Sequence, residues 1–348
     1  MSNYDQFAAA VKEISGGKNV VLLDDLGLPS VYVPINKLKN SEIISGGSEN
    51  THPAFSVNGV EKSRFLYSKY QNIVINGRAY SLSHRDPKTY VNFDQARQAC
   101  EAKGAGFHLG TLAEWAAVAL LTRKMGTMPH GNNNYGGDSA YTYEKGQESA
   151  KDNNKTGRTF TGSGPATWGH DHTQFGIQDM NGNVWEWLGG MRLNEGEIQI
   201  IPYNNAALGS ECDMSASSTL WKAIKNDGSL VAPGTAATLK YDFVSGNIQL
   251  TTGITSAQDA GRGGSYTAMT LASGVTAPEL AKALILYPDE PGKDYGGDYH
   301  WMNNAGERLP IAGGSWGNGA LAGVFYLHLS ARSHSGGDVG FRSAYVEL

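Results

Sequence analysis

The chain has 348 residues, of which 40% are hydrophobic, 10% aromatic and only 18% charged, with 45 glycines and a net charge of −5. This composition is sufficient for a sizeable core but favours turns and loops over long helices, which predicts an α+β fold with much irregular structure. The chain has no run of lysine or arginine and no apolar stretch of the ~18 residues that a membrane span needs. We therefore expect no nucleic-acid partner and no membrane insertion.

The N-terminal part of the chain is patterned as one short helix followed by strands. Its first residues lack the cationic and apolar regions of a secretory signal, so none is predicted. Apolar residues recur at helical spacing over 5–14, and the segments 19–25 and 30–35 are patterned as strands. Asn-Gly pairs at 58–59 and 76–77 are strong signals for β-hairpins.

Two helices are predicted next. Asn92 and Gln95 have the spacing of an N-cap and its partner, and Thr111 and Glu114 repeat that spacing as a capping box. The second helix should end at Gly126, a residue type that favours the left-handed conformation after a helix. Its apolar positions surround it almost completely, so we expect it to be buried.

The remaining segments contain few regular patterns. Residues 130–164 are rich in Asn, Gly, Ser and Asp, which is typical of a loop. Residues 191–300 show strand patterns in 241–253 and a short helix in 277–286, and are predicted to be a loop-rich insertion. The two cysteines match no metal or redox spacing, and Cys100 is predicted to be a buried free thiol.

Several segments together resemble one family. GFHLGTLAEWAAVA (106–119), GIQDMNGNVWEW (176–187), GGSW (313–316) and VGFR (339–342) resemble the formylglycine-generating-enzyme type of C-type lectin fold, in the same order and with similar spacing. The resemblance covers most of residues 52–348, and its central segment is highly specific. It implies two helices around a small twisted antiparallel sheet, with many ordered loops.

The resemblance also implies a domain organisation. Residues 1–51 would be an N-terminal segment for oligomerisation or attachment. Residues 52–348 would form the C-type lectin domain, with the insertion at 191–300 beside the site and a variable ligand-binding region at 313–342. Residues 52–70 resemble the opening segment of phage-tail proteins with this fold, which implies a location in the virion tail, or in the host cytoplasm before assembly.

Proteins with this fold have very different functions, so the function must be argued from site residues. A copper oxidase of the formylglycine-generating kind needs two thiolates in the C-terminal part, and residues 301–348 contain no cysteine. An iron-dependent oxidase needs clustered histidines, and only His170 and His172 are close in sequence. These two are expected to be solvated or bonded to loops. We therefore predict no enzyme; a metal-dependent oxidase and a structural virion component are the alternatives.

The third function is ligand binding by the variable protein of a diversity-generating retroelement, whose variable region the segment 313–342 resembles. In such regions adenine-rich codons vary, whereas framework codons such as that of Trp316 hold few adenines. The positions reachable from adenine-rich codons are predicted to vary and to contact the ligand. They are Ser315, Gly317, Asn318, Leu321, Tyr326, His328, Ser330, His334, Gly336, Gly337 and Asp338.

Residues 325–330 alternate between apolar and polar side chains. Alternate residues of a strand point to opposite faces, so the apolar ones should face the core. Tyr326, His328 and Ser330 should then share an outer face that contacts the ligand. The expected partner is a protein or glycan on a cell surface, with a homo-oligomer giving multivalent display.

The central signature is predicted to be structural. Trp185 and Trp187 should pack in the core, and Glu186 should accept hydrogen bonds from loop backbone. Arg342 is expected to be a buried, hydrogen-bonded structural arginine.

No cofactor is predicted to be required. The oxygen-rich segment with Asp179, Asn181 and Asn183 would suit calcium as a structural ion, because calcium prefers hard oxygen ligands.

Overall fold

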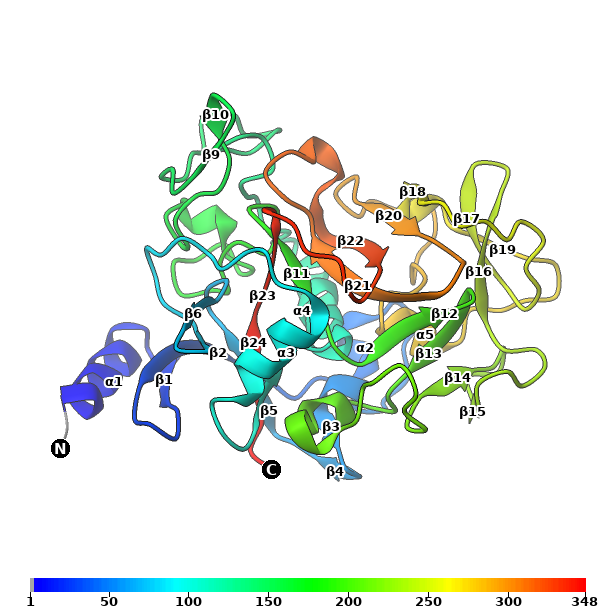
Figure 1. Cartoon of the computed structure of the whole chain (residues 1–348), viewed down its shortest axis with the longest axis horizontal. Coiled ribbons are helices and arrows are strands. Elements are labelled where there is room, and N and C mark those ends of the chain that lie inside the picture. Colours follow the sequence, from blue (N-terminus) through cyan, green and yellow to red (C-terminus); the bar gives the residue numbers. More distant parts are fainter. Residues whose placement is uncertain (1–2) are drawn as a thin grey trace.

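The computed structural model describes residues 3–348, in which two large sheets organise the fold (Figure 1). The smaller of them is antiparallel, with the strand order β1-β2-β5-β24-β8. Its strands are β1 (Val20–Leu23), β2 (Pro29–Asn36), β5 (Arg64–Ser68), β24 (Ser343–Tyr345) and β8 (Phe107–Leu109). The early strands of the chain therefore lie in one sheet with the last strand.

The larger sheet has 13 strands, so the prediction of one small antiparallel sheet around which the fold is built is not confirmed. Its main path is β18-β20-β22-β21-β12-β13-β16-β17-β19, and β11, β14, β15 and β23 branch from it. The bounds are β11 (Trp185–Trp187), β12 (Met191–Asn194), β13 (Glu197–Ile200), β14 (Lys222–Ile224), β15 (Leu230–Val231), β16 (Lys240–Val244), β17 (Asn247–Thr251), β18 (Arg262–Ser265), β19 (Thr270–Leu271), β20 (Tyr299–Met302), β21 (Glu307–Gly313), β22 (Gly323–Ser330) and β23 (Val339–Phe341).

The insertion explains the size of this sheet. Nine of the 13 strands, β12 to β20, begin within residues 191–300, but they are short, and most residues of this insertion lie outside helices and strands, as expected for a loop-rich insertion. The predicted strands in 241–253 are β16 and β17. Parallel pairing places β20 beside β22, so the insertion lies next to the predicted variable strand, as expected.

Three two-stranded hairpins complete the strands of residues 3–348. They are β3 (Ser56–Val57) with β4 (Val60–Glu61), β6 (Ile73–Ile75) with β7 (Arg78–Tyr80), and β9 (Lys151–Asp152) with β10 (Lys155–Thr156). Asn58 and Asn76 have φ of 51°, and the glycine after each also has positive φ. Positive φ at both central residues is the type I′ turn, so both predicted Asn-Gly hairpins are confirmed.

The helices confirm the local signals of the sequence. They are α1 (Asn3–Ile14), α2 (Asn40–Ile43), α3 (Phe93–Glu101), α4 (Leu112–Met125) and α5 (Glu279–Ala283), and the 3₁₀ turns are η1 (Pro53–Phe55), η2 (Ala166–Trp168), η3 (Asn205–Glu211), η4 (Tyr266–Ala268) and η5 (Gly319–Leu321). Both capping boxes form, and α4 ends at Gly126 with φ 71°. Most residues of α4 are buried, as predicted.

The predicted boundary between residues 51 and 52 does not separate two packing units. β2 pairs with β5 over five residues, from Tyr32 with Ser68 to Asn36 with Arg64. Only α1 stands apart: it has no buried residue and lies at one side of the molecule next to β1 (Figure 1). The N-terminal segment is therefore part of the fold from β1 onward.

The main core lies between α4 and the large sheet. Trp115 is fully buried, and its indole nitrogen Nε1 donates to the backbone oxygen of Val324 in β22 at 2.7 Å. Cys100 and Cys212 are both buried free thiols. No helix in residues 3–348 has the length and apolar character needed to cross a membrane.

Candidate functional site

A buried ion pair holds the central signature in place. Arg342 Nε donates to Glu186 Oε2 at 2.6 Å and Arg342 Nη2 donates to Oε1 at 2.9 Å, and both residues are 1% exposed. The other N–H groups of Arg342 reach backbone carbonyls, including that of Gln178. Arg342 is structural, as predicted. Glu186 differs from the prediction, because it accepts from the side chains of Arg342 and Gln71 rather than from loop backbone.

The two signature tryptophans share one face of β11, because residues two apart in a strand point the same way, and both belong to one buried cluster. Trp187 is fully buried, with its ring edge against Phe93, as predicted. Trp185 is 6% exposed and points toward β22, where its ring centroid lies 4.5 Å from that of Tyr326 and 5.8 Å from that of His328. Its backbone N–H donates to the oxygen of Asp338 at 2.8 Å. Trp185 thus joins β22 to the loop that precedes β23.

The side chains of the oxygen-rich turn, Asp179, Asn181 and Asn183, make hydrogen bonds within the fold. Asn183 Oδ1 accepts from Asn132 and from the backbone N–H of Thr159, and the Asn181 amide donates to a backbone carbonyl. Asp179 Oδ2 accepts from a backbone N–H, whereas Oδ1 is buried without a partner. Burial raises the pKa of Asp179 to about 6. Nothing in these contacts tests the expectation of calcium.

The two clustered histidines bond to loop backbone, as predicted. His170 Nδ1 accepts from the N–H of Ile177 at 2.9 Å, and His172 Nε2 lies 2.9 Å from the oxygen of Met128. Within residues 3–348, no three His, Cys, Asp or Glu side chains come together in a way that would hold a metal ion.

The predicted variable positions gather on one surface, which we call the C-terminal face. It consists of the η5 turn with the residues before it (315–321), the outer face of β22 (326, 328 and 330) and the loop 334–338. Trp185 contacts Tyr326 and His328 of β22 with its ring, and Asp338 of the loop 334–338 with its backbone N–H. Three of the positions are exposed, namely Gly317, Leu321 and His334. Five are partly exposed, namely Asn318, His328, Gly336, Gly337 and Asp338.

Three predicted contact positions are buried, which corrects the prediction of a fully exposed strand face. Tyr326 is 2% exposed, and Ser315 and Ser330 are each 6% exposed. The cause at Tyr326 is its neighbours across the sheet, because the Tyr299 ring from β20 and the Trp185 ring both pack edge-on against it. Burial raises the pKa of Tyr326 to about 12.

His328 remains partly exposed between two tryptophan rings. Its Nδ1 lies 2.9 Å from the hydroxyl of Ser330, and the Trp301 ring from β20 lies 6.2 Å away. Burial, with a smaller contribution from His334, lowers the pKa of His328 to about 4. The imidazole is therefore neutral at pH 7 and offers a donor or an acceptor rather than a charge.

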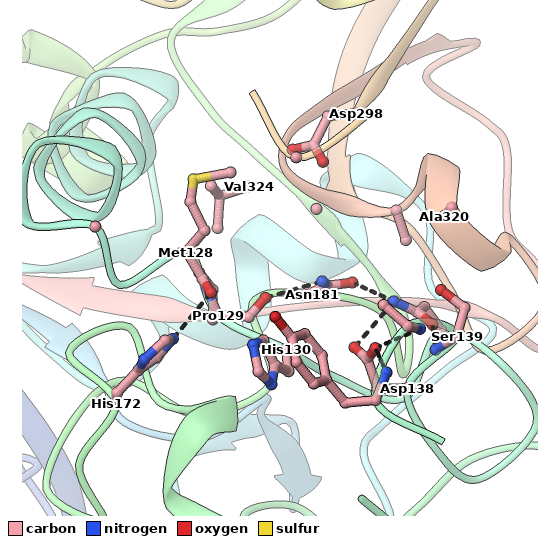
Figure 2. A pocket seen from close by; sticks show the side chains of 17 residues that line it. Met128, Pro129, His130, Asp138, Ser139, His172, Asn181, Asp298, Ala320 and Val324 are labelled. Carbon is pink, nitrogen blue, oxygen red and sulfur yellow. Dashed lines mark hydrogen bonds between the residues drawn. The ribbon is translucent and has the colours of Figure 1, made fainter. Parts of the chain in front are cut away.

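A cavity of about 360 Å³ opens beside the C-terminal face (Figure 2). Its walls come from four parts of the chain, namely the segment after α4, the segment 172–181, the loop before β20, and the start of β22 with the turn before it. His130 and Tyr141 stack in its wall, with centroids 3.8 Å apart. The cavity thus borders the predicted variable region directly.

Asp298 is the cavity residue that the sequence did not single out. It is 2% exposed, and its Oδ2 accepts from the N–H of Phe325 at 2.7 Å. The carboxylate lies against Gly323, where an added Cβ would come within 2.1 Å of Oδ1. Burial raises the pKa of Asp298 well above its usual range. In the sequence this aspartate follows two glycines in a loop-like stretch, and no local signal separates it from a solvated residue.

Comparison with known proteins identifies the family. The model of the sulfatase-modifying factor enzyme 1-like domain matches residues 34–269, about two thirds of the chain. No curated protein matches. Among solved structures, Treponema denticola variable protein 1 and PvdO from Pseudomonas aeruginosa are each 13% identical and align with 94% of this chain and 98% of theirs, with TM-scores of 0.35 and 0.39.

A third solved structure, the Major Tropism Determinant P3c variant, is 11% identical, with 94% of this chain and 71% of that chain covered and a TM-score of 0.31. The domain match confirms the resemblance to the formylglycine-generating-enzyme type. The chain belongs to the family of the sulfatase-modifying factor enzyme 1-like domain.

Proposed function

We propose that this chain is a non-enzymatic display protein, the variable protein of a diversity-generating retroelement, which binds a ligand with its C-terminal face. The observation that carries the proposal is that eight of the eleven predicted variable positions reach the surface, and that Trp185 contacts both β22 and Asp338 in the loop 334–338. We further propose that it is a phage or prophage receptor-binding protein, located in the virion tail.

The packing beneath the face supports this role. Phe325 and Leu327 are fully buried, and Trp115 is hydrogen-bonded to β22 from the opposite side. Surface substitutions away from such packing usually change the unfolding free energy by less than ~0.5 kcal/mol. The exposed positions can therefore change while the framework stays folded, which is what a diversified binding surface requires.

The alternative is a metal-dependent oxidase on the same fold. A thiolate copper site needs cysteines in the C-terminal part, and residues 301–348 contain none. Metal analysis of the purified protein separates the two functions, because stoichiometric copper or iron would support the oxidase. A structural virion component, the other alternative, would bury the C-terminal face in an assembly.

Sequencing the 3′ end of the gene in a population of sister genomes tests the proposal. Substitutions should concentrate at the exposed positions of the C-terminal face, such as Leu321 and His334, and spare Trp316, Phe325 and Leu327. The matched reference is an exposed position outside the face, such as Leu26, which should not vary more than the rest of the gene. A uniform C-terminal region would contradict diversification.

Binding to target cells gives a second test. The triple substitution Leu321→Ala, His328→Ala and His334→Ala should reduce cell binding by about tenfold or more, because contact residues at a few positions carry most of the binding energy. The control is Leu26→Ala with Val60→Ala, two exposed apolar side chains on other elements. Unchanged binding by a folded triple variant would contradict the proposal.

A further inference from the structure

The cavity beside the C-terminal face is lined by two acidic side chains. Its 17 lining residues include Asp138 and Asp298 but no lysine or arginine. The two carboxylates differ in their hydrogen bonds. Asp138 accepts from four N–H groups, three of backbone and one of a side-chain amide, so its acceptor capacity is largely used.

The carboxylate of Asp298 can accept further hydrogen bonds. Among the described residues, the one hydrogen bond to its carboxylate is the N–H of Phe325 on Oδ2. An ionised carboxylate has about four acceptor sites. Burial disfavours this charged form of Asp298, so a cation that enters the cavity and donates to Oδ1 would stabilise it. Burying a carboxylate with so few partners is costly, and a ligand that donates to Oδ1 would offset that cost.

Apolar side chains line one part of the cavity wall, and polar side chains such as Ser139 and Asn181 line the remainder. Figure 2 shows Asp298 at one end and His130 with Asp138 at the other, and the walls between them include Met128 and Val324. Further small apolar side chains, Pro129, Ala320 and Ala322, also line it. Methylene groups of a ligand would pack against this apolar part of the wall.

We propose that this cavity binds the side chain of a lysine on a protein ligand, with the ammonium group on Asp298 Oδ1 and the methylene groups against the apolar walls. This inference rests on the proposed binding function and names the ligand chemistry of the same site. An ammonium is favoured over a guanidinium because Oδ2 is already occupied, and a planar guanidinium gains most from both carboxylate oxygens.

Gly323 is required for this arrangement. Its missing side chain leaves room for the carboxylate of Asp298, which lies within 2.4 Å of where a Cβ would stand. Asp298 itself lies outside the predicted variable region 313–342. The site therefore combines a fixed acceptor in the cavity with changeable side chains at its rim.

Titration of the full-length chain with N-acetyl-lysine-N-methylamide tests the proposal. The matched probe is N-acetyl-norleucine-N-methylamide, which has a comparable alkyl side chain without the ammonium. The lysine probe should bind saturably and shift the backbone amide resonance of Phe325, and the norleucine probe should bind about tenfold more weakly or not at all. Because the two probes act on the same unaltered protein, this comparison does not depend on the folding of a variant.

Variants then locate the acceptor. Asp298→Asn should weaken lysine binding by about tenfold or more, since a hydrogen bond to a charged group is lost. The control is Asp294→Asn, which removes the same charge from an exposed residue nearby. Equal binding of the two probes, no saturable binding of the lysine probe, or unchanged lysine binding by folded Asp298→Asn would each overturn the proposal.

Glucosamine distinguishes an amino sugar from a lysine. Tighter binding of glucosamine than of the lysine probe would also overturn the proposal. None of these titrations uses a cellular target or the natural variation of the gene. A failure of the lysine site is therefore separate from a failure of the proposed display function.

Discussion

Arg342 is the residue on which the C-terminal strands most depend. It connects β11, the end of β5 and the loop around Gln178 through a bidentate contact with Glu186 and three backbone carbonyls. Removing one partner of a buried ion pair leaves the other charge without compensation, which costs more than the pair itself contributes.

We therefore expect Arg342→Leu to lower the free energy of unfolding by about 3–5 kcal/mol. The control is Arg308→Leu, whose partner Asp259 is mostly exposed, and there the loss should stay below about 1 kcal/mol. Urea unfolding of both variants at pH 7 measures the difference. Similar losses in the two variants would show that burial of the Arg342 pair does not matter.

The sequence predicted the structural role of Arg342 and the buried free thiol of Cys100, but not the burial of Tyr326. Alternation along a strand assigns side chains to two faces, and Tyr326 does share a face with His328. Whether a face is exposed depends on what packs across it. Tyr299 is remote in the sequence, so no local pattern could show that its ring would cover Tyr326. The same holds for Asp298, whose partner Phe325 belongs to another element.

At the scale of elements, α4 is tied to its surroundings by the capping box. Glu114 accepts from the N–H of Thr111 and also contacts Nε2 of His108 in β8 at 2.9 Å, and both side chains are fully buried. Burial lowers the pKa of His108, but the Glu114 carboxylate outweighs it and raises this pKa above 6.5. The charged pair therefore links the start of α4 to the smaller sheet.

This pair makes stability depend on pH. Because the pKa of His108 is higher in the folded state, its contribution is complete below the unfolded value of 6.5 and is lost as the pH rises through the folded value. His108→Gln should thus lower the free energy of unfolding by about 2 kcal/mol at pH 6 and by less at pH 9.

Urea unfolding of the wild type and of His108→Gln across this range measures the change. The control is His84→Gln, an exposed residue where a small effect is expected. A His108 difference that grows with pH would contradict the assignment of the charged pair.

Elements with local signals were predictable, whereas the sheet was not. Capping boxes, Asn-Gly turns and helical spacing are each contained within a few residues, and all formed as expected. Pairing between distant strands leaves no such signal. The parallel pairing of β20 with β22, through His300 with Leu327, joins the insertion at 191–300 to the predicted variable strand. The 13-stranded sheet follows from pairings of this kind.

At the scale of the molecule, the boundary in the N-terminal part lies between α1 and β1 rather than between residues 51 and 52. Tyr32 and Ile35 of β2 are 0% and 4% exposed and pack in the core, whereas α1 has no buried residue. Two truncations therefore separate attachment from folding. Removing residues 1–14 should change the free energy of unfolding by no more than ~0.5 kcal/mol, because α1 contributes no buried side chain.

Removing residues 1–36 should prevent cooperative folding. β5 would lose its partner along five residues, and each large buried side chain that is removed from a core costs about 2–5 kcal/mol. Since a domain is stable by only about 5–15 kcal/mol, losing Tyr32, Val33 and Ile35 together would use most of that margin. Thermal unfolding followed by circular dichroism compares the two truncations. A cooperative transition in the 37–348 chain close to that of the intact protein would mean that the segment is separate from the domain after all.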